Sequence, residues 1–184
     1  MCYYICMIIF LCRDGDIGTD ELVAECLKIY IERTGADGVI PYDARIKRIN
    51  GKPFFENLDI YFSYTDTERL QIVAMSRNNV GVDAEYIRDV RYKRIADRFF
   101  THGEALSIKK PRDFFNIWTA KEAYSKYTAL GIASFRQFDI KKISDIFVTR
   151  LEVGENYSAH CVSADNAVEY YDMSVLLKRG AIDY

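Results

Sequence analysis

Two carboxylates in a short alternating segment are the first residues whose spacing suggests chemistry. Asp83 and Glu85 alternate with the apolar Val82 and Ala84, as in a half-buried strand, so both carboxylates are expected on one face. Side chains two apart on a strand are separated by roughly 7 Å, and like charges at this spacing repel unless a cation lies between them. Carboxylate oxygens are ligands that Mg²⁺ prefers. The segment is a candidate magnesium site, although an exposed strand shows the same pattern by chance.

A helical segment from Asn116 to Gly131 supplies a second pair, Glu122 and Lys126. Their four-residue spacing predicts that both lie on one helix face, with Trp118 one turn earlier. An ordinary solvated Glu–Lys pair at this spacing contributes only roughly 0.2–0.5 kcal/mol. The spacing alone therefore fits a surface ion pair as well as it fits a functional site.

Composition narrows the class of protein. The 184 residues are 49% hydrophobic, enough to fill a sizeable core, and the net charge of −2 argues against a nucleic-acid binder. The apolar segment Tyr3–Leu11 has no basic residues before it and is too short to cross a bilayer, so we expect no membrane partner. Five cysteines without a Cys-x-x-Cys pair fit free thiols in a reducing cytoplasm.

Hydrophobic periodicity predicts the elements that must position these residues. A helix is expected over 20–34 and another, with a strongly positive face, over 86–98. The basic segment 38–53 reads as an edge strand and turn that contains Lys52. The remaining strands are expected at 3–11, 60–65, 70–76, 80–85, 135–140, 146–151, 157–162 and 168–177.

The two acidic motifs occur together in a known order. Gly81-Val82-Asp83-Ala84-Glu85, followed by Trp118-Thr119-Ala120-Lys121-Glu122-Ala123 and then Lys126, resembles the 4′-phosphopantetheinyl transferase superfamily, of the larger surfactin-synthetase-activating (Sfp-like) type. The resemblance runs from about residue 20 to about residue 165. Three further features stand in the family's order: Asn50-Gly51-Lys52-Pro53, Phe62-Ser63-Tyr64-Thr65, and Arg98-Phe99-Phe100 before Glu104.

The resemblance implies an α+β fold made of two similar α/β halves related by a pseudo-twofold. The expected halves are residues 1–82 and 83–184, packed as one unit with coenzyme A in the cleft between them. Site residues would come from both halves.

The implied activity transfers the 4′-phosphopantetheine group of coenzyme A to a serine of an apo acyl or peptidyl carrier protein and releases 3′,5′-ADP. Asp83, Glu85 and Glu122 would hold Mg²⁺. Glu122, or a water that it orients, would take the proton of the serine. Lys126 would grip the phosphates and stabilise the leaving group.

The coenzyme-binding residues implied by the resemblance are Lys52, Ser63, Tyr64 and Lys126. Tyr64 departs from the family, which has a histidine at this position, and a phenol is not a cation near neutral pH. Weaker coenzyme binding is therefore expected. The related proteins also carry a basic segment near the N-terminus that is absent here, and its contact with the 3′-phosphate is either lost or taken over by Arg45, Lys47 and Arg48.

The sequence leaves three points open. The positive face over 86–98 is either solvated or docks an acidic carrier protein. Glu104 matches a family acid with a suggested part in proton transfer. The chain is either the transferase, expected as a cytoplasmic monomer, or a non-catalytic member that binds coenzyme A or a carrier protein; a magnesium-dependent phosphohydrolase is the third alternative.

Overall fold

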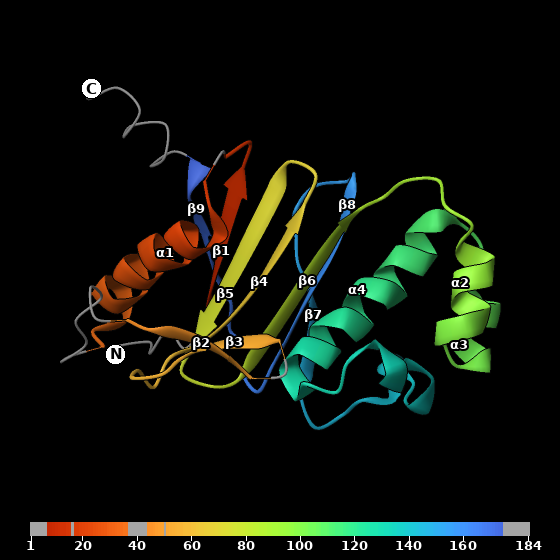
Figure 1. Ribbon diagram of the computed structural model, residues 1–184. Helices are drawn as coiled ribbons and strands as arrows, with labels where there is room; N and C mark the ends of the chain where they lie inside the picture. The colour runs from red at the N-terminus through yellow and green to blue at the C-terminus, as the bar shows by residue number, and fades with distance from the viewer. Residues whose placement is uncertain (1–6, 16, 37–43, 50, 175–184) are drawn as a thin grey trace.

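The computed structural model describes residues 7–15, 17–36, 44–49 and 51–174, which form an α+β fold as expected (Figure 1). The predicted strand positions 3–6 and 175–177 lie outside the described residues. The strands are β1 (Met7–Arg13), β2 (Ile46–Ile49), β3 (Lys52–Phe55), β4 (Tyr61–Thr67), β5 (Leu70–Ser76), β6 (Val80–Tyr86), β7 (Phe147–Arg150), β8 (Tyr157–Ser163) and β9 (Glu169–Asp172). The helices are α1 (Thr19–Thr34), α2 (Tyr92–Phe99), α3 (His102–Ser107) and α4 (Pro111–Thr128), with the short 3₁₀ helices η2 (Ile132–Gln137) and η3 (Ile140–Lys142).

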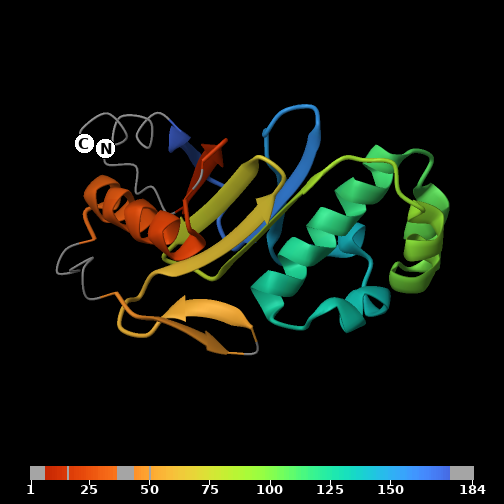
Figure 2. The same cartoon turned by 45° about the horizontal axis from the view of Figure 1, so that its top comes forward.

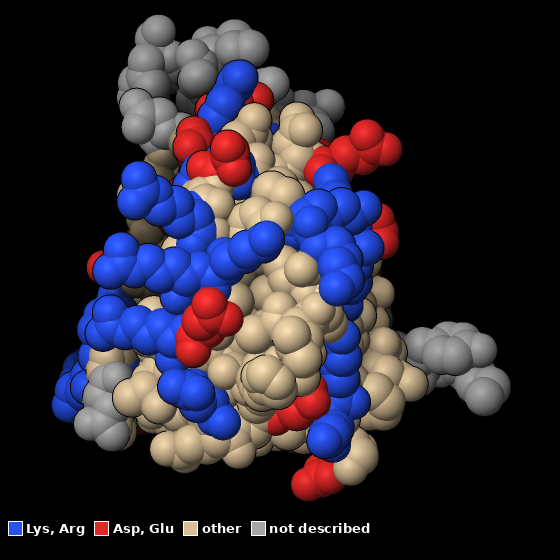
Figure 3. All heavy atoms as spheres, turned by 90° about the vertical axis from the view of Figure 1, so that its right-hand side faces the viewer, with Lys and Arg blue, Asp and Glu red and all other residues tan. Residues whose placement is uncertain are grey.

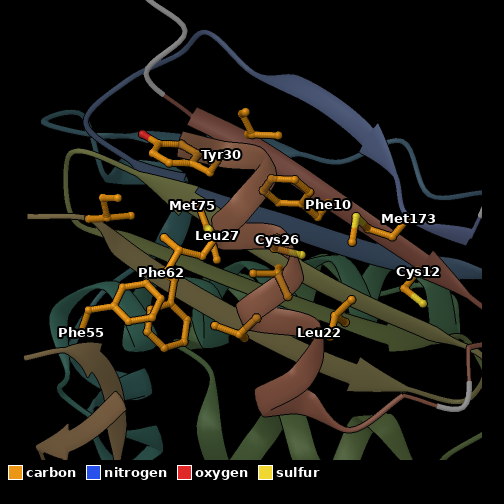
Figure 4. Close-up of a cluster of buried hydrophobic side chains, with 14 of the residues drawn as sticks. Phe10, Cys12, Leu22, Cys26, Leu27, Tyr30, Phe55, Phe62, Met75 and Met173 are labelled. Carbon is orange, nitrogen blue, oxygen red and sulfur yellow. The ribbon is translucent and has the colours of Figure 1, made fainter. Parts of the chain in front are cut away.

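The first sheet has the order β4-β5-β1-β9 and carries α1 on its outer face. Apolar side chains of α1, among them Leu22, Cys26 and Tyr30, pack against Phe10 and Phe62 of the sheet (Figure 4). This packing follows from the helical spacing of the apolar residues over 20–34. Alternate residues of β1 face the opposite way into a second core, so the strand is apolar on both faces.

The second sheet, β6-β8-β7, lies between the first sheet and α4. Val80, Val82 and Ala84 of β6 face the first sheet in a shared apolar core. The alternating residues Asp83 and Glu85 point to the other face, which α4 covers. The layers therefore run from α1 through two sheets to α4, and the strand period places both carboxylates against the helix that carries Glu122 and Lys126 (Figure 1).

In the N-terminal part, β1 is followed by α1, the β2–β3 hairpin and the antiparallel pair β4–β5, and β5 pairs with β1. In the C-terminal part, β6 is followed by helices that include α4 and by the antiparallel pair β7–β8, and β8 pairs with β6. A pseudo-twofold produces this pattern, and the symmetry itself stays a prediction. The expected boundary between residues 82 and 83 falls inside β6. Strand β9 runs parallel to β1 and thereby joins the C-terminal part of the chain to the N-terminal sheet.

Two expected elements differ in the structure. The helix expected over 86–98 begins only at Tyr92. The backbone N–H of Ile87 still donates to the carbonyl of Asn156, which lies in the connection between β7 and β8, and so the chain stays extended past β6. The prediction of a strand at 135–140 is wrong, since two short 3₁₀ helices occupy this segment. The carbonyls of Phe135 and Phe138 turn inward to accept hydrogen bonds from Lys121, which an extended strand does not allow.

None of the helices within the described ranges combines the length and apolarity that a membrane crossing requires.

Candidate active site

A cavity of about 820 Å³ is lined by residues of the β2–β3 hairpin, β4 and the C-terminal end of α4. Figure 2 shows how these elements are arranged. Three cationic side chains from three separate elements line it: Arg48, Lys52 and Lys126. Ser63 and Tyr64 of β4 form part of the same wall. A concave site of this volume with converging cations suits a small molecule that carries several negative charges.

Lys126 joins the cavity to the acidic residues of β6. Its Nζ lies 2.8 Å from Oδ1 of Asp83 and also donates to the backbone carbonyls of Val82 and Tyr64, at 2.9 and 3.2 Å. About a third of the Lys126 side chain is exposed, and it lines the cavity. The spacing on α4 predicted that Glu122 and Lys126 share one helix face, and the structure shows that Lys126 contacts Asp83.

Asp83 is buried and only half satisfied. Oδ1 accepts hydrogen bonds from Lys126 and from Thr65 Oγ1, at 2.8 and 3.2 Å. Oδ2 is buried with no hydrogen-bond partner among the described residues. Burial raises the pKa of Asp83, while the charge of Lys126 opposes this effect.

Glu122 and Glu85 are the other two predicted metal ligands, but with Asp83 they do not form a closed coordination site. Burial, followed by the nearby Asp83 carboxylate, raises the pKa of Glu122 to about 7. Glu85 pairs with Arg88 at 3.0 Å. Among the described residues, no group of three acidic, histidine or cysteine side chains is gathered closely enough to hold a metal ion as it stands.

The acidic residues nevertheless fit a divalent cation. The Oδ2 atom of Asp83 is an orphaned buried oxygen of the type that Mg²⁺ binds. Asp83 and Glu85 both raise the pKa of Glu122, so the carboxylates are near enough to repel one another. A positive ion relieves such repulsion.

Gly81 explains how α4 comes so close to β6. A Cβ atom at this position would collide with the carbonyl oxygen of Ala123 and would lie 2.6 Å from the backbone nitrogen of Tyr127. Only glycine therefore lets the helix backbone rest on the strand here. This close approach brings Lys126 within reach of Asp83.

Comparison with known proteins identifies the family. Residues 79–175, just over half of the chain, match the model of the 4′-phosphopantetheinyl transferase superfamily. The chain belongs to this superfamily. The matched range contains Asp83, Glu85, Glu122 and Lys126, whereas Lys52, Ser63 and Tyr64 lie before it.

Three curated members of this superfamily resemble the chain. It is 33% identical to 4′-phosphopantetheinyl transferase HetI of Nostoc sp. over 107 residues, which cover 54% of this chain and 45% of HetI. It is 33% identical to the 4′-phosphopantetheinyl transferase gsp of Aneurinibacillus migulanus over 88 residues, which cover 45% and 36% of the two chains. Identity to the 4′-phosphopantetheinyl transferase psf-1 of Bacillus pumilus is 25% over 139 residues, covering 72% and 59%. The chain therefore spans about half the length of the curated relatives it matches.

Three hydroxyl side chains of β4 attach this strand to β6. Ser63, Thr65 and Thr67 accept hydrogen bonds from the backbone N–H groups of Val82, Ala84 and Tyr86, at 3.1, 3.3 and 3.1 Å. Thr65 also donates to Asp83, so its proton is already used. Ser63 only accepts among the described residues, which leaves its own proton to donate toward the cavity.

Tyr64, the departure from the family, holds Arg48. The guanidinium Nη2 donates to the phenol oxygen at 3.2 Å, and the guanidinium carbon lies 5.9 Å from the ring centroid. The sequence offered Arg48 only as one of three basic residues for a phosphate. Of these three, Arg48 lines the cavity, whereas Lys47 pairs with Glu56.

Lys52 enters the cavity wall from β3. Its Nζ donates to Asn79 Oδ1 at 2.5 Å and to the carbonyl of Tyr127 at 3.1 Å, so it also caps the C-terminal end of α4. Burial lowers the pKa of Lys52 to about 8. Asn79, which also donates to Tyr127 O at 2.6 Å, is a positioning residue that lies between the strands expected at 70–76 and 80–85 and was not predicted to have a role.

Glu104 does not line this cavity. It is 1% exposed and pairs with the fully buried Lys121 at 2.9 Å. Its carboxylate also accepts from the backbone and hydroxyl of Thr101 and from the backbone of Ile140. These contacts use both oxygens to join α3, α4 and η3, and so they favour a structural role.

Basic side chains gather at the end of the molecule formed by α2 and α3. Figure 3 shows Lys and Arg in bands on both sides of a mostly uncharged surface. On α3, Leu106 is 62% exposed. The exposed basic residues of this region are Arg91, Lys93, Arg94, Arg98, Lys109, Lys110, Arg136, Lys141 and Lys142.

Proposed function

We propose that the protein transfers the 4′-phosphopantetheine group of coenzyme A to a serine of an apo carrier protein and releases 3′,5′-ADP. The observation that carries the proposal is the contact of Lys126 with Asp83 at the edge of a cavity lined by three cations. Membership of the superfamily supports the same reaction.

Coenzyme A carries a pyrophosphate group and a further 3′-phosphate, and the cavity offers a matching set of hydrogen-bond donors. Arg48, Lys52 and Lys126 supply positive charge, and Ser63 supplies a hydroxyl proton. Tyr64 acts through Arg48, which it holds against the cavity wall. Charge-assisted hydrogen bonds of this kind are among the strongest a protein makes to phosphate.

Asp83, Glu85 and Glu122 are the residues that would hold Mg²⁺. When bound, the ion neutralises charge on the pyrophosphate as the phosphorus–oxygen bond breaks. Lys126 then acts on the leaving side, where it stabilises the negative charge of 3′,5′-ADP. Glu122, directly or through an oriented water, accepts the proton of the attacking serine hydroxyl.

The carrier protein would approach over the basic surface of α2 and α3. Carrier proteins of this reaction are acidic, and complementary charge accelerates and orients such encounters. The protein would act as a monomer in the cytoplasm, which agrees with the buried free thiols of Cys12, Cys26 and Cys161.

The test is a transfer assay on the purified chain. We incubate it with apo acyl and peptidyl carrier proteins, coenzyme A and MgCl₂, and measure carrier mass. The expected product is a carrier heavier by one phosphopantetheine group, together with 3′,5′-ADP, and chelation by EDTA should stop its formation. A chain that binds coenzyme A in calorimetry but leaves every carrier at its original mass would instead be a non-catalytic member. Phosphate products formed without carrier would indicate a phosphohydrolase.

A further inference from the structure

A second cavity lies on the opposite flank of α4 from Glu122. It has a volume of about 410 Å³ and is formed by α4, η3, β7 and β8. Ala120 lines it, and Ala120 stands two residues, or about 200° of helix rotation, from Glu122. The cavity is therefore separate from the one assigned to the coenzyme, and none of the residues in the proposed transfer reaction lines it.

Two lining residues, Asn116 and His160, take part in a buried hydrogen-bond chain. The Thr119 hydroxyl donates to the carbonyl of Phe115 at 2.8 Å, and Ser158 donates to Asn116 Oδ1 at 2.8 Å. Thr119 Oγ1 also lies 2.8 Å from Nδ1 of His160. Because the proton of Thr119 is used on Phe115, we assign the hydrogen of the imidazole to Nδ1, which donates to Thr119.

This tautomer leaves Nε2 of His160 as a hydrogen-bond acceptor. His160 is 8% exposed and lines the cavity, and Nε2 has no partner among the described residues. Burial, followed by the nearby Arg150, lowers the pKa of His160 to about 4, so the ring is neutral at neutral pH. Because the ring lines the cavity, a hydrogen-bond donor bound there can reach this lone pair.

The remaining lining combines an apolar wall with a positive rim. Ile117, Ile140 and Val148 supply the wall. Arg150 and Lys141 are exposed at the rim, and neither side chain has an ion-pair partner among the described residues. A ligand complementary to these groups needs a hydrogen-bond donor, an aliphatic body and a negative charge.

We propose that this cavity binds a small aliphatic hydroxy acid. Its hydroxyl donates to Nε2 of His160, its chain packs against Ile117 and Ile140, and its carboxylate pairs with Arg150. This site is additional to the proposed transfer reaction and does not depend on it. The same helix, α4, borders both cavities, so a ligand here contacts the element that presents Glu122 and Lys126.

Titration calorimetry with two matched probes tests the site. The probes are 3-hydroxyoctanoate and octanoate, which differ only in the hydroxyl group. In the wild-type protein the hydroxy acid should bind about tenfold more tightly, because octanoate leaves Nε2 of His160 unpaired. His160→Phe should remove this difference between the probes. Arg150→Gln should weaken both acids by about tenfold, since it removes the partner of the carboxylate.

Two further variants keep the test decisive if His160→Phe does not fold. Val148→Trp fills the cavity from the edge strand β7 and should abolish binding of both probes. Lys52→Gln alters the coenzyme cavity and the C-terminal cap of α4 but none of the residues that line the second cavity, and should leave hydroxy-acid binding unchanged. Equal wild-type affinity for the two acids, unaltered binding in Val148→Trp, or loss of binding in Lys52→Gln would each overturn the proposal. Failure of the carrier assay would leave these results unaffected.

Discussion

Asp83 combines two features that a purely structural carboxylate avoids. One oxygen contacts Lys126 and the other is buried without a partner among the described residues. Leaving a buried polar atom unpaired costs roughly 1–3 kcal/mol. Such a cost persists where the atom has a ligand to meet, which fits a metal-binding role.

Replacing the acidic residues should separate activity from folding. Asp83→Ala and Glu122→Gln are expected to lower kcat/KM for carrier modification at least about 100-fold, because each removes a metal ligand or proton acceptor. The melting temperature should change by no more than a few degrees, since burial already disfavours both charges. Carrier mass and thermal melts measure the two effects. Wild-type kcat/KM in either variant would refute the assigned roles.

Neighbouring residues of β2 allow a matched test of coenzyme binding. Arg48→Gln should weaken coenzyme A binding about tenfold, or about 1.4 kcal/mol, because it removes one cation from the cavity wall. Lys47→Gln removes the same charge from a side chain that pairs with Glu56, and should change the affinity less than twofold. Calorimetry at several salt concentrations compares the two. Equal effects of both substitutions would assign Arg48 a general electrostatic role only.

The pKa of Lys52 predicts how coenzyme binding depends on pH. Because burial lowers this pKa to about 8, the ammonium loses its proton as pH rises through 8, earlier than an exposed lysine. Coenzyme affinity should therefore fall between pH 7 and 9. Lys52→Arg, which stays charged, should flatten this fall. Identical pH profiles for the wild type and the arginine variant would show that Lys52 does not contact the ligand.

The close contact between α4 and β6 depends on Gly81, which has no side chain. Gly81→Ala should push the helix away from the strand, lowering the melting temperature by several degrees and activity more than tenfold. Gly103→Ala in α3 is the control, since a Cβ there meets nothing within 4 Å and alanine favours the helix. Wild-type activity in Gly81→Ala would show that the helix position is not critical.

Sequence periodicity predicted the elements of the site better than the contacts between them. Alternation around Asp83 and four-residue spacing around Lys126 placed each residue on one face of its element, but did not show that these two faces meet. The link through Thr65 was not predictable, because a threonine on a strand shows no preference for a distant N–H group. The prediction of a strand at 135–140 was wrong because the apolar residues Phe135 and Phe138 are spaced to pack around Lys121.

At the scale of the whole molecule, charge is distributed unevenly. Residues 87–150 contain 14 lysines and arginines against 7 acidic residues, although the whole chain has a net charge of −2. The remainder therefore carries −9. If the proposed acidic carrier is the partner, this asymmetry would orient the molecule toward it before contact. The composition of the whole chain conceals the asymmetry.

Charge reversal tests this orientation. Arg94→Glu on α2 should lower kcat/KM for an acidic carrier about tenfold at low ionic strength, and less than twofold near 0.5 M salt. Arg77→Glu makes the same charge change on an exposed residue outside the basic region. It should alter kcat/KM less than twofold at either salt concentration. Equal losses in both variants would mean that net charge, and no local surface, governs the encounter.

The pairing of β9 with β1 also governs how the chain is completed during synthesis. On the ribosome, β1 acquires β5 once residue 76 has emerged, but its other edge stays open until residues 169–172 follow. Arg13 and Ser174, which hydrogen-bond across this seam, are 161 positions apart. An apolar strand edge thus stays unpaired while the residues between β5 and β9 are synthesised, so newly made chains should depend on chaperones until β9 has paired.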